Sequence, residues 1–119
     1  MKECFTTAEL QQLGDSSIVD FDKRIASIPD DLCGQFHQEA RQLETELLTF
    51  YKIVAIGTKK VEDLTAIATA WKAMVEICDK FANRLRDLTE KHPFCGAQYY
   101  YDRVLDLRNK CNRLQLMHS

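Results

Sequence analysis

Two cysteines and two histidines are spaced so that they could bind a metal ion. Cys33 and His37 lie one helical turn apart, and His92 precedes Cys95 by three positions. Antiparallel helices would bring both pairs to one end of the molecule, and two cysteines with two histidines form a set that tetrahedral zinc accepts. The spacing matches no known zinc signature, and Cys33 also suits a core position as a small hydrophobic residue. We therefore expect no cofactor, and we keep a structural zinc-binding bundle as an alternative.

The other candidate pair is Cys78 and Cys111, which lie far apart in the sequence. If the segments that carry them run antiparallel, the two cysteines face each other in the core at the same height, where a disulfide is geometrically conceivable. The chain has five cysteines, an odd number without Cys-x-x-Cys spacing, which a secreted disulfide framework explains poorly. We predict reduced, packed thiols in a cytoplasmic protein.

Segment 86–92 (Arg-Asp-Leu-Thr-Glu-Lys-His) places a histidine after an arginine with five residues between them. It resembles the arginine–histidine motif of HEPN-type ribonucleases. That resemblance implies that Arg86 and His92 cooperate on a scissile phosphate across a dimer. A solvated helix end explains the same residues, because Glu90 can pair with Arg86 and His92 suits the negative end of the helix dipole. A HEPN-like RNA-cleaving or nucleotidyl-substrate-binding domain is kept as an alternative function.

Other motifs that carry catalysis are absent from the sequence. It contains no Gly-rich phosphate loop, no Gly-x-Ser-x-Gly elbow, no His-Glu-x-x-His and no paired Glu-x-x-His of a di-iron bundle. We predict that the chain is not an enzyme.

Three consecutive tyrosines are the strongest candidates for binding. Successive helical residues point about 100° apart, so Tyr99, Tyr100 and Tyr101 cannot all enter one core. Tyrosine and arginine are enriched at protein-interface hot spots, and Arg103 and Arg108 follow closely. We predict partner binding by Tyr99, Tyr101, Arg103 and Arg108. The alternative is that Tyr100 is core and the other two tyrosines lie flat over neighbouring helices.

These residues must be positioned by helices, because hydrophobic side chains recur every three or four positions over long segments. The expected helices span about 17–28, 30–56, 59–91 and 97–116, and a short helical turn before the first of them is expected to end at Gly14. Only four glycines and two prolines occur, too few for the turns of a β-sandwich. Few, long helices are therefore favoured.

The 119 residues fit one domain, 1–119, and short connections make neighbouring helices antiparallel. We predict an all-α, up-and-down antiparallel helical bundle with three long helices and a shorter N-terminal helix. Segment 59–91 carries an extra apolar row, so it must touch at least two neighbours. That row consists of Ile67, Met74, Phe81 and Leu88. If the short helix fills its groove incompletely, the row would serve as a homodimer surface.

Charge and hydropathy narrow the class of partner. The net charge of −2 argues against nucleic acid, and no apolar run approaches the ~20 residues that span a membrane. Residues 1–46 hold ten acids and four bases, net −6, which leaves twelve bases and eight acids, net +4, in the rest. We expect these halves to pack together and cancel much of the field. The leading interpretation is a non-catalytic interaction module (an adaptor, small chaperone or regulator) that binds a protein partner.

Overall fold

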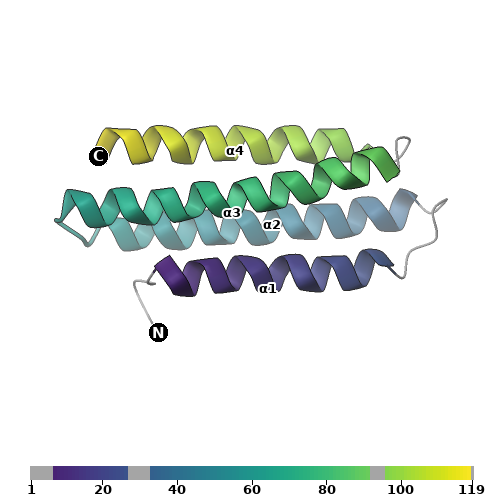
Figure 1. Cartoon of the computed structure of the whole chain (residues 1–119), viewed down its shortest axis with the longest axis horizontal. Helices are drawn as coiled ribbons and strands as arrows, with labels where there is room; N and C mark the ends of the chain where they lie inside the picture. Colours follow the sequence, from purple (N-terminus) through teal and green to yellow (C-terminus); the bar gives the residue numbers. More distant parts are fainter. Residues whose placement is uncertain (1–6, 27–32, 92–95, 119) are drawn as a thin grey trace.

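The computed structural model describes residues 7–26, 33–91 and 96–118, and these residues form an all-α helical bundle (Figure 1). Its helices are α1 (Thr7–Ala26), α2 (Cys33–Thr58), α3 (Leu64–Lys91) and α4 (Ala97–His118). Within the described ranges there is no strand. The predicted fold class is confirmed. None of the helices in this part of the chain is long and apolar enough to cross a membrane.

Contacts between helices give the direction in which each one runs. Asp15 and Asp22 on α1 pair with Lys80 and Arg84 on α3, in the same order along both helices, so α1 and α3 are parallel. Figure 1 shows that each helix runs back along the one before it, so α2 and α4 share the opposite direction. Helix α3 packs against all three other helices, whereas α1 and α4 lie on opposite sides of it.

The wide apolar face predicted for segment 59–91 is buried within the single chain. All four residues of its extra row are buried: Ile67, Met74, Phe81 and Leu88. Because α3 touches every other helix, both of its apolar rows find partners inside the bundle. This row therefore leaves no spare surface for a second subunit, and a homodimer would need a different one.

Helix α1 departs most from the prediction. It is continuous over 20 residues, nearly matching the 22 of α4, and it passes through Gly14 without a break. Gly14 is buried, and a Cβ atom built there would lie 3.1 Å from both Cγ1 and Cγ2 of Ile77 on α3. The expected stop at Gly14 was wrong, because this glycine allows α1 and α3 to approach closely instead of ending the helix.

The connection between α2 and α3 also differs from the prediction. Gly57, which directly follows the helix predicted over 30–56, is buried inside α2, which ends at Thr58. Helix α3 starts at Leu64, later than expected, because Asp63 caps it: its Oδ1 accepts a hydrogen bond from the backbone N–H of Thr65 at 3.0 Å. The predicted end of the helix over 17–28 and the predicted start of the helix over 30–56 include residues 27–28 and 30–32, which lie outside the described residues.

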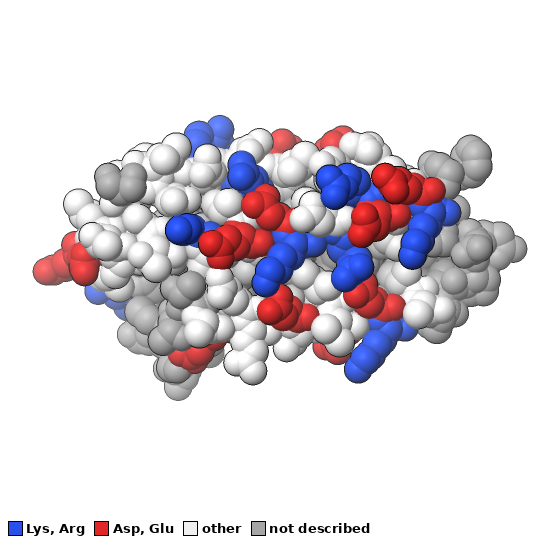
Figure 2. All heavy atoms as spheres, in the orientation of Figure 1, with Lys and Arg blue, Asp and Glu red and all other residues white. Residues whose placement is uncertain are grey.

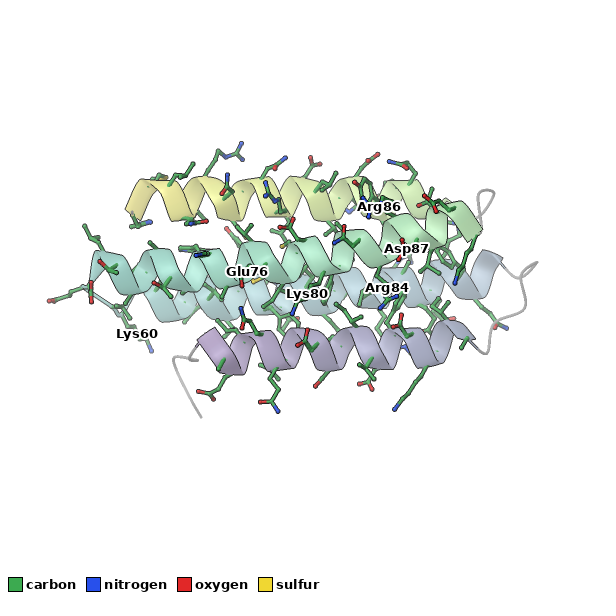
Figure 3. All side chains as sticks on the ribbon, viewed as in Figure 1. Lys60, Glu76, Lys80, Arg84, Arg86 and Asp87 are labelled. Carbon is green, nitrogen blue, oxygen red and sulfur yellow. The ribbon has the colours of Figure 1, made fainter. Side chains whose placement is uncertain are left out.

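Charged side chains confirm that the acidic first part of the chain packs against the basic remainder. Ion pairs that join the two parts are Asp15–Lys80 (2.8 Å), Asp22–Arg84 (3.2 Å) and Glu44–Arg103. Figure 3 shows Glu76, Lys80 and Arg84 projecting from α3 toward α1. On the face drawn in Figure 2 acidic and basic groups alternate without a large patch of one sign. This face therefore offers no basic stripe to nucleic acid.

Gly96, which precedes α4, is expected to tolerate no side chain. Its φ of 73° lies in the left-handed region, and a Cβ atom there would lie 2.9 Å from Cε1 of His37. We expect Gly96→Ala to lower the free energy of unfolding by about 1–2 kcal/mol, measured by urea denaturation. The control is Gly34→Ala, since Gly34 is exposed and, among the described residues beyond its own helical turn, none has an atom within 4 Å of a Cβ added there. Equal stability of the two variants would contradict this account of the turn.

Candidate protein-docking surface

The structure divides the four predicted binding residues between two sides of α4. Tyr99 and Arg103 lie one turn apart, and Arg103 reaches an acid on α2. Arg108 reaches an acid on α3, and Tyr101, two turns before it, lies on the same side of the helix. A single surface that contains all four residues is therefore not formed, and Tyr99 and Arg103 must be considered separately from Tyr101 and Arg108.

Tyr99 is exposed yet held in a fixed position. Its side chain is 57% exposed, and the guanidinium carbon of Arg103 lies 5.5 Å from its ring centroid. Arg103 also donates a hydrogen bond from Nη1 to the Tyr99 hydroxyl at 3.2 Å and pairs through Nε with Glu44 on α2. The hydrogen bond from Arg103 to Glu44 and the negative charge of Glu44 raise the pKa of Arg103 above its usual value. The ring of Tyr100 packs edge-on against Tyr99, with centroids 5.1 Å apart.

Tyr100 is the core member of the three tyrosines. It is buried, and its hydroxyl lies 3.4 Å from Nδ1 of His37 on α2. The two rings pack with centroids 5.7 Å apart. The prediction that Tyr100 enters the core is confirmed, and its burial fixes the rotation of α4 that turns Tyr99 outward.

A groove of about 200 Å³ lies beside this cluster, between α2 and α4. Its walls combine apolar side chains with a charged rim: Glu44, Leu47, Leu48, Arg103, Val104, Asp106 and Leu107. Leu47 and Val104 are buried and belong to the core, whereas Leu48 is 38% exposed. An apolar floor beside an exposed tyrosine and a paired arginine is the composition of a protein-binding surface. We call Tyr99, Arg103, Glu44 and Leu48 the Tyr99 surface.

Sequence reasoning identified only half of this surface. Glu44 and Leu48 come from α2 and were not among the predicted binding residues. They lie one turn apart on that helix, which places them on one face, but nothing in the sequence indicates that this face meets α4. Buried Leu47 and Val104 pack where the two helices meet, and the ion pair between Glu44 and Arg103 spans the same contact.

The other two predicted residues contribute to packing. Arg108 contacts Oδ1 of Asp79 through Nε at 3.0 Å and so links α4 to α3. Tyr101 is half-buried and packs against the hydrophobic core. The alternative interpretation of the tyrosines, in which they lie flat over their neighbours, therefore describes Tyr101 but not Tyr99.

The metal and nuclease hypotheses fall largely outside the described residues. Of the candidate zinc ligands, the side chains of Cys33, His92 and Cys95 are outside them. His37 is placed, half-buried and against Tyr100. Within ranges 7–26, 33–91 and 96–118, no three side chains of metal-ligating type come together. Arg86 is exposed on α3, on the side nearer α4 (Figure 3), but its proposed partner His92 is not described.

Cys78 and Cys111 meet in the core, as their spacing predicted. Both thiols are free and fully buried, and they hydrogen-bond to each other across the contact between α3 and α4. This hydrogen bond, together with burial, raises the pKa of Cys78. The same hydrogen bond lowers the pKa of Cys111.

A separate apolar cavity of about 60 Å³ lies where α2 ends and α3 begins. Leu10, Val54 and Ile67 line it from three helices. The hydroxyl of Thr58, which also lines it, donates hydrogen bonds to the carbonyls of Val54 and Ala55 in its own helix. An engineered cavity of about 150 Å³ binds benzene, and this one has less than half that volume.

Comparison with known proteins adds no relative to this description. No family model matches the sequence, and neither a curated protein nor a solved structure is significantly similar to the chain.

Proposed function

We propose that the chain is a non-catalytic protein-interaction module, an adaptor, small chaperone or regulator, whose partner docks on the Tyr99 surface. One observation carries the proposal: Tyr99 is 57% exposed although Arg103 and Tyr100 hold its ring in place. A restrained aromatic ring loses little conformational entropy when it is buried by a partner. Tyrosine and arginine are also the residues most often found at interface hot spots.

The groove next to Tyr99 supports a protein partner in preference to nucleic acid. Its accessible apolar side chains, Leu48 and Leu107, suit the hydrophobic anchors of a protein. Its rim carries Asp106, which repels phosphate groups, and the positive charge of Arg103 is already neutralised by Glu44. A partner helix with apolar side chains every three or four residues fits a groove that is itself formed by two helices.

The five cysteines, an odd number without Cys-x-x-Cys spacing, support the accompanying proposal of a cytoplasmic location. Reducing compartments keep thiols unpaired, whereas oxidising compartments convert neighbouring thiols to disulfides.

The experiment compares Tyr99→Ala with a matched control, Val19→Ala. Val19 is 51% exposed but lies on α1, which does not touch α4. Each variant and the original chain are used to capture proteins from a lysate of the source cell, and captured proteins are quantified by mass spectrometry. Because a hot-spot truncation costs about 2 kcal/mol or more, we expect Tyr99→Ala to bind at least one protein roughly thirtyfold more weakly than the original chain and to capture correspondingly less of it.

The control should capture that protein normally, and all three chains should have the same circular dichroism spectrum and be fully folded at the temperature of the assay. If the set and amounts of captured proteins are the same for Tyr99→Ala and the original chain, the Tyr99 surface is not the docking site.

A further inference from the structure

Two cysteine thiols lie against each other in the core, at the contact between α3 and α4. Cys78 and Cys111 are each 0% exposed, and their side chains are hydrogen-bonded. The neighbouring ion pair between Asp79 and Arg108, at 3.0 Å, independently fixes α4 against α3 at this height. The two thiols thus come from two helices to one place in the core, where a bond between them would join α3 to α4.

We propose that Cys78 and Cys111 form a reversible disulfide that cross-links α3 to α4 when the protein meets a peroxide. In the first step the thiolate of Cys111 attacks one peroxide oxygen, the O–O bond breaks, and the other oxygen leaves as water after taking up a proton. In the second step the sulfur of Cys78 attacks the resulting sulfenic acid of Cys111. The S–S bond forms and a second water leaves, so the two thiols supply the two electrons that reduce the peroxide.

The two thiols shift each other's pKa in opposite directions, and we assign the first attack to the one whose pKa is lowered. Their hydrogen bond lowers the pKa of Cys111, and the positive charge of Lys110 acts in the same direction. It raises the pKa of Cys78, which stays protonated and donates the hydrogen bond. The thiolate is the nucleophile, so Cys111 attacks and Cys78 resolves the sulfenic acid.

Burial controls the rate of the reaction, and the bond, once formed, changes the stability of the fold. Since both sulfur atoms are fully buried, peroxide reaches them only when α4 moves away from α3. The bond closes the chain between residues 78 and 111 into a loop and removes freedom from the unfolded state. It also ties α4, the helix that carries Tyr99, to α3.

The test treats the folded, full-length chain with hydrogen peroxide and then maps its peptides without reduction. We expect a mass lower by two hydrogen atoms, a peptide pair that joins Cys78 to Cys111, and a melting temperature higher by at least about 5 °C. Dithiothreitol should reverse all three changes. The proposal is overturned if the folded chain gives instead sulfinic or sulfonic acids, links that involve only Cys4, Cys33 or Cys95, or no change while the urea-unfolded chain is oxidised.

The control is Cys111→Ala, checked for folding by circular dichroism. It should give no intramolecular bond to Cys78 and no rise in melting temperature after peroxide. The mapping of the unaltered chain does not depend on this variant, and no partner protein enters either assay. The result is therefore independent of the function proposed for the Tyr99 surface.

Discussion

Replacing Phe21 by alanine is expected to lower the free energy of unfolding by about 3–5 kcal/mol. Phe21 is 0% exposed and lies in the core, although it belongs to α1, the first helix of the chain. Alanine would lose the transfer energy of the ring and leave a cavity between α1 and its neighbours. Urea denaturation followed by circular dichroism measures the difference.

Val19 provides the matched control for this prediction, because it lies two residues away on the same helix and is 51% exposed. Val19→Ala is expected to change the free energy of unfolding by no more than about 0.5 kcal/mol. Similar small losses for Phe21→Ala and Val19→Ala would show that α1 does not pack against the rest of the bundle.

A large side chain at Gly14 is expected to destabilise the bundle by about 3 kcal/mol, through overpacking instead of a cavity. The first carbon of any side chain there already lies 3.1 Å from two carbons of Ile77, so the remaining atoms of leucine have no space between α1 and α3. We expect Gly14→Leu to unfold at a lower urea concentration than the original chain.

The same substitution at Gly34 separates crowding from helix propensity. Gly34 lies in α2 and is exposed, and in the part of the chain that the structure describes no atom beyond its own helical turn lies within 4 Å of an added Cβ. Gly34→Leu is therefore expected to be neutral or to stabilise by about 0.5–1 kcal/mol. A Gly14→Leu variant that is as stable as Gly34→Leu would refute the close approach of α1 to α3.

The helices could be predicted where hydrophobic periodicity is strong. The prediction was wrong at Gly14, where a glycine alone was taken to end a helix. Leu10, Gly14, Ile18 and Phe21 lie on one buried face of α1, so the apolar stripe passes through the glycine. The cost of glycine in a helix, about 1 kcal/mol, is smaller than the gain from burying the hydrophobic residues on both sides of it. That continuity was the signal that could have identified one long helix.

Only part of the candidate site could be predicted, because it depends on how α4 is rotated. The three tyrosines showed that one must face outward, but the choice of Tyr99 is made by the burial of Tyr100 against His37. Glu44 reaches Arg103 from 59 residues away in the sequence. Helical spacing predicts contacts only between residues three or four positions apart in one helix, so it could not predict a contact between residues on two different helices.

Photocrosslinking at position 99 tests most directly whether the Tyr99 surface docks a protein. Tyr99 is replaced by benzoylphenylalanine, which keeps an aromatic ring at the 57% exposed site, and a second chain carries the same group at the 51% exposed Val19. After irradiation in the source cell, we predict a protein adduct of defined mass from position 99 and none from position 19. Absence of an adduct at position 99, or the same adducts from both positions, would contradict the account.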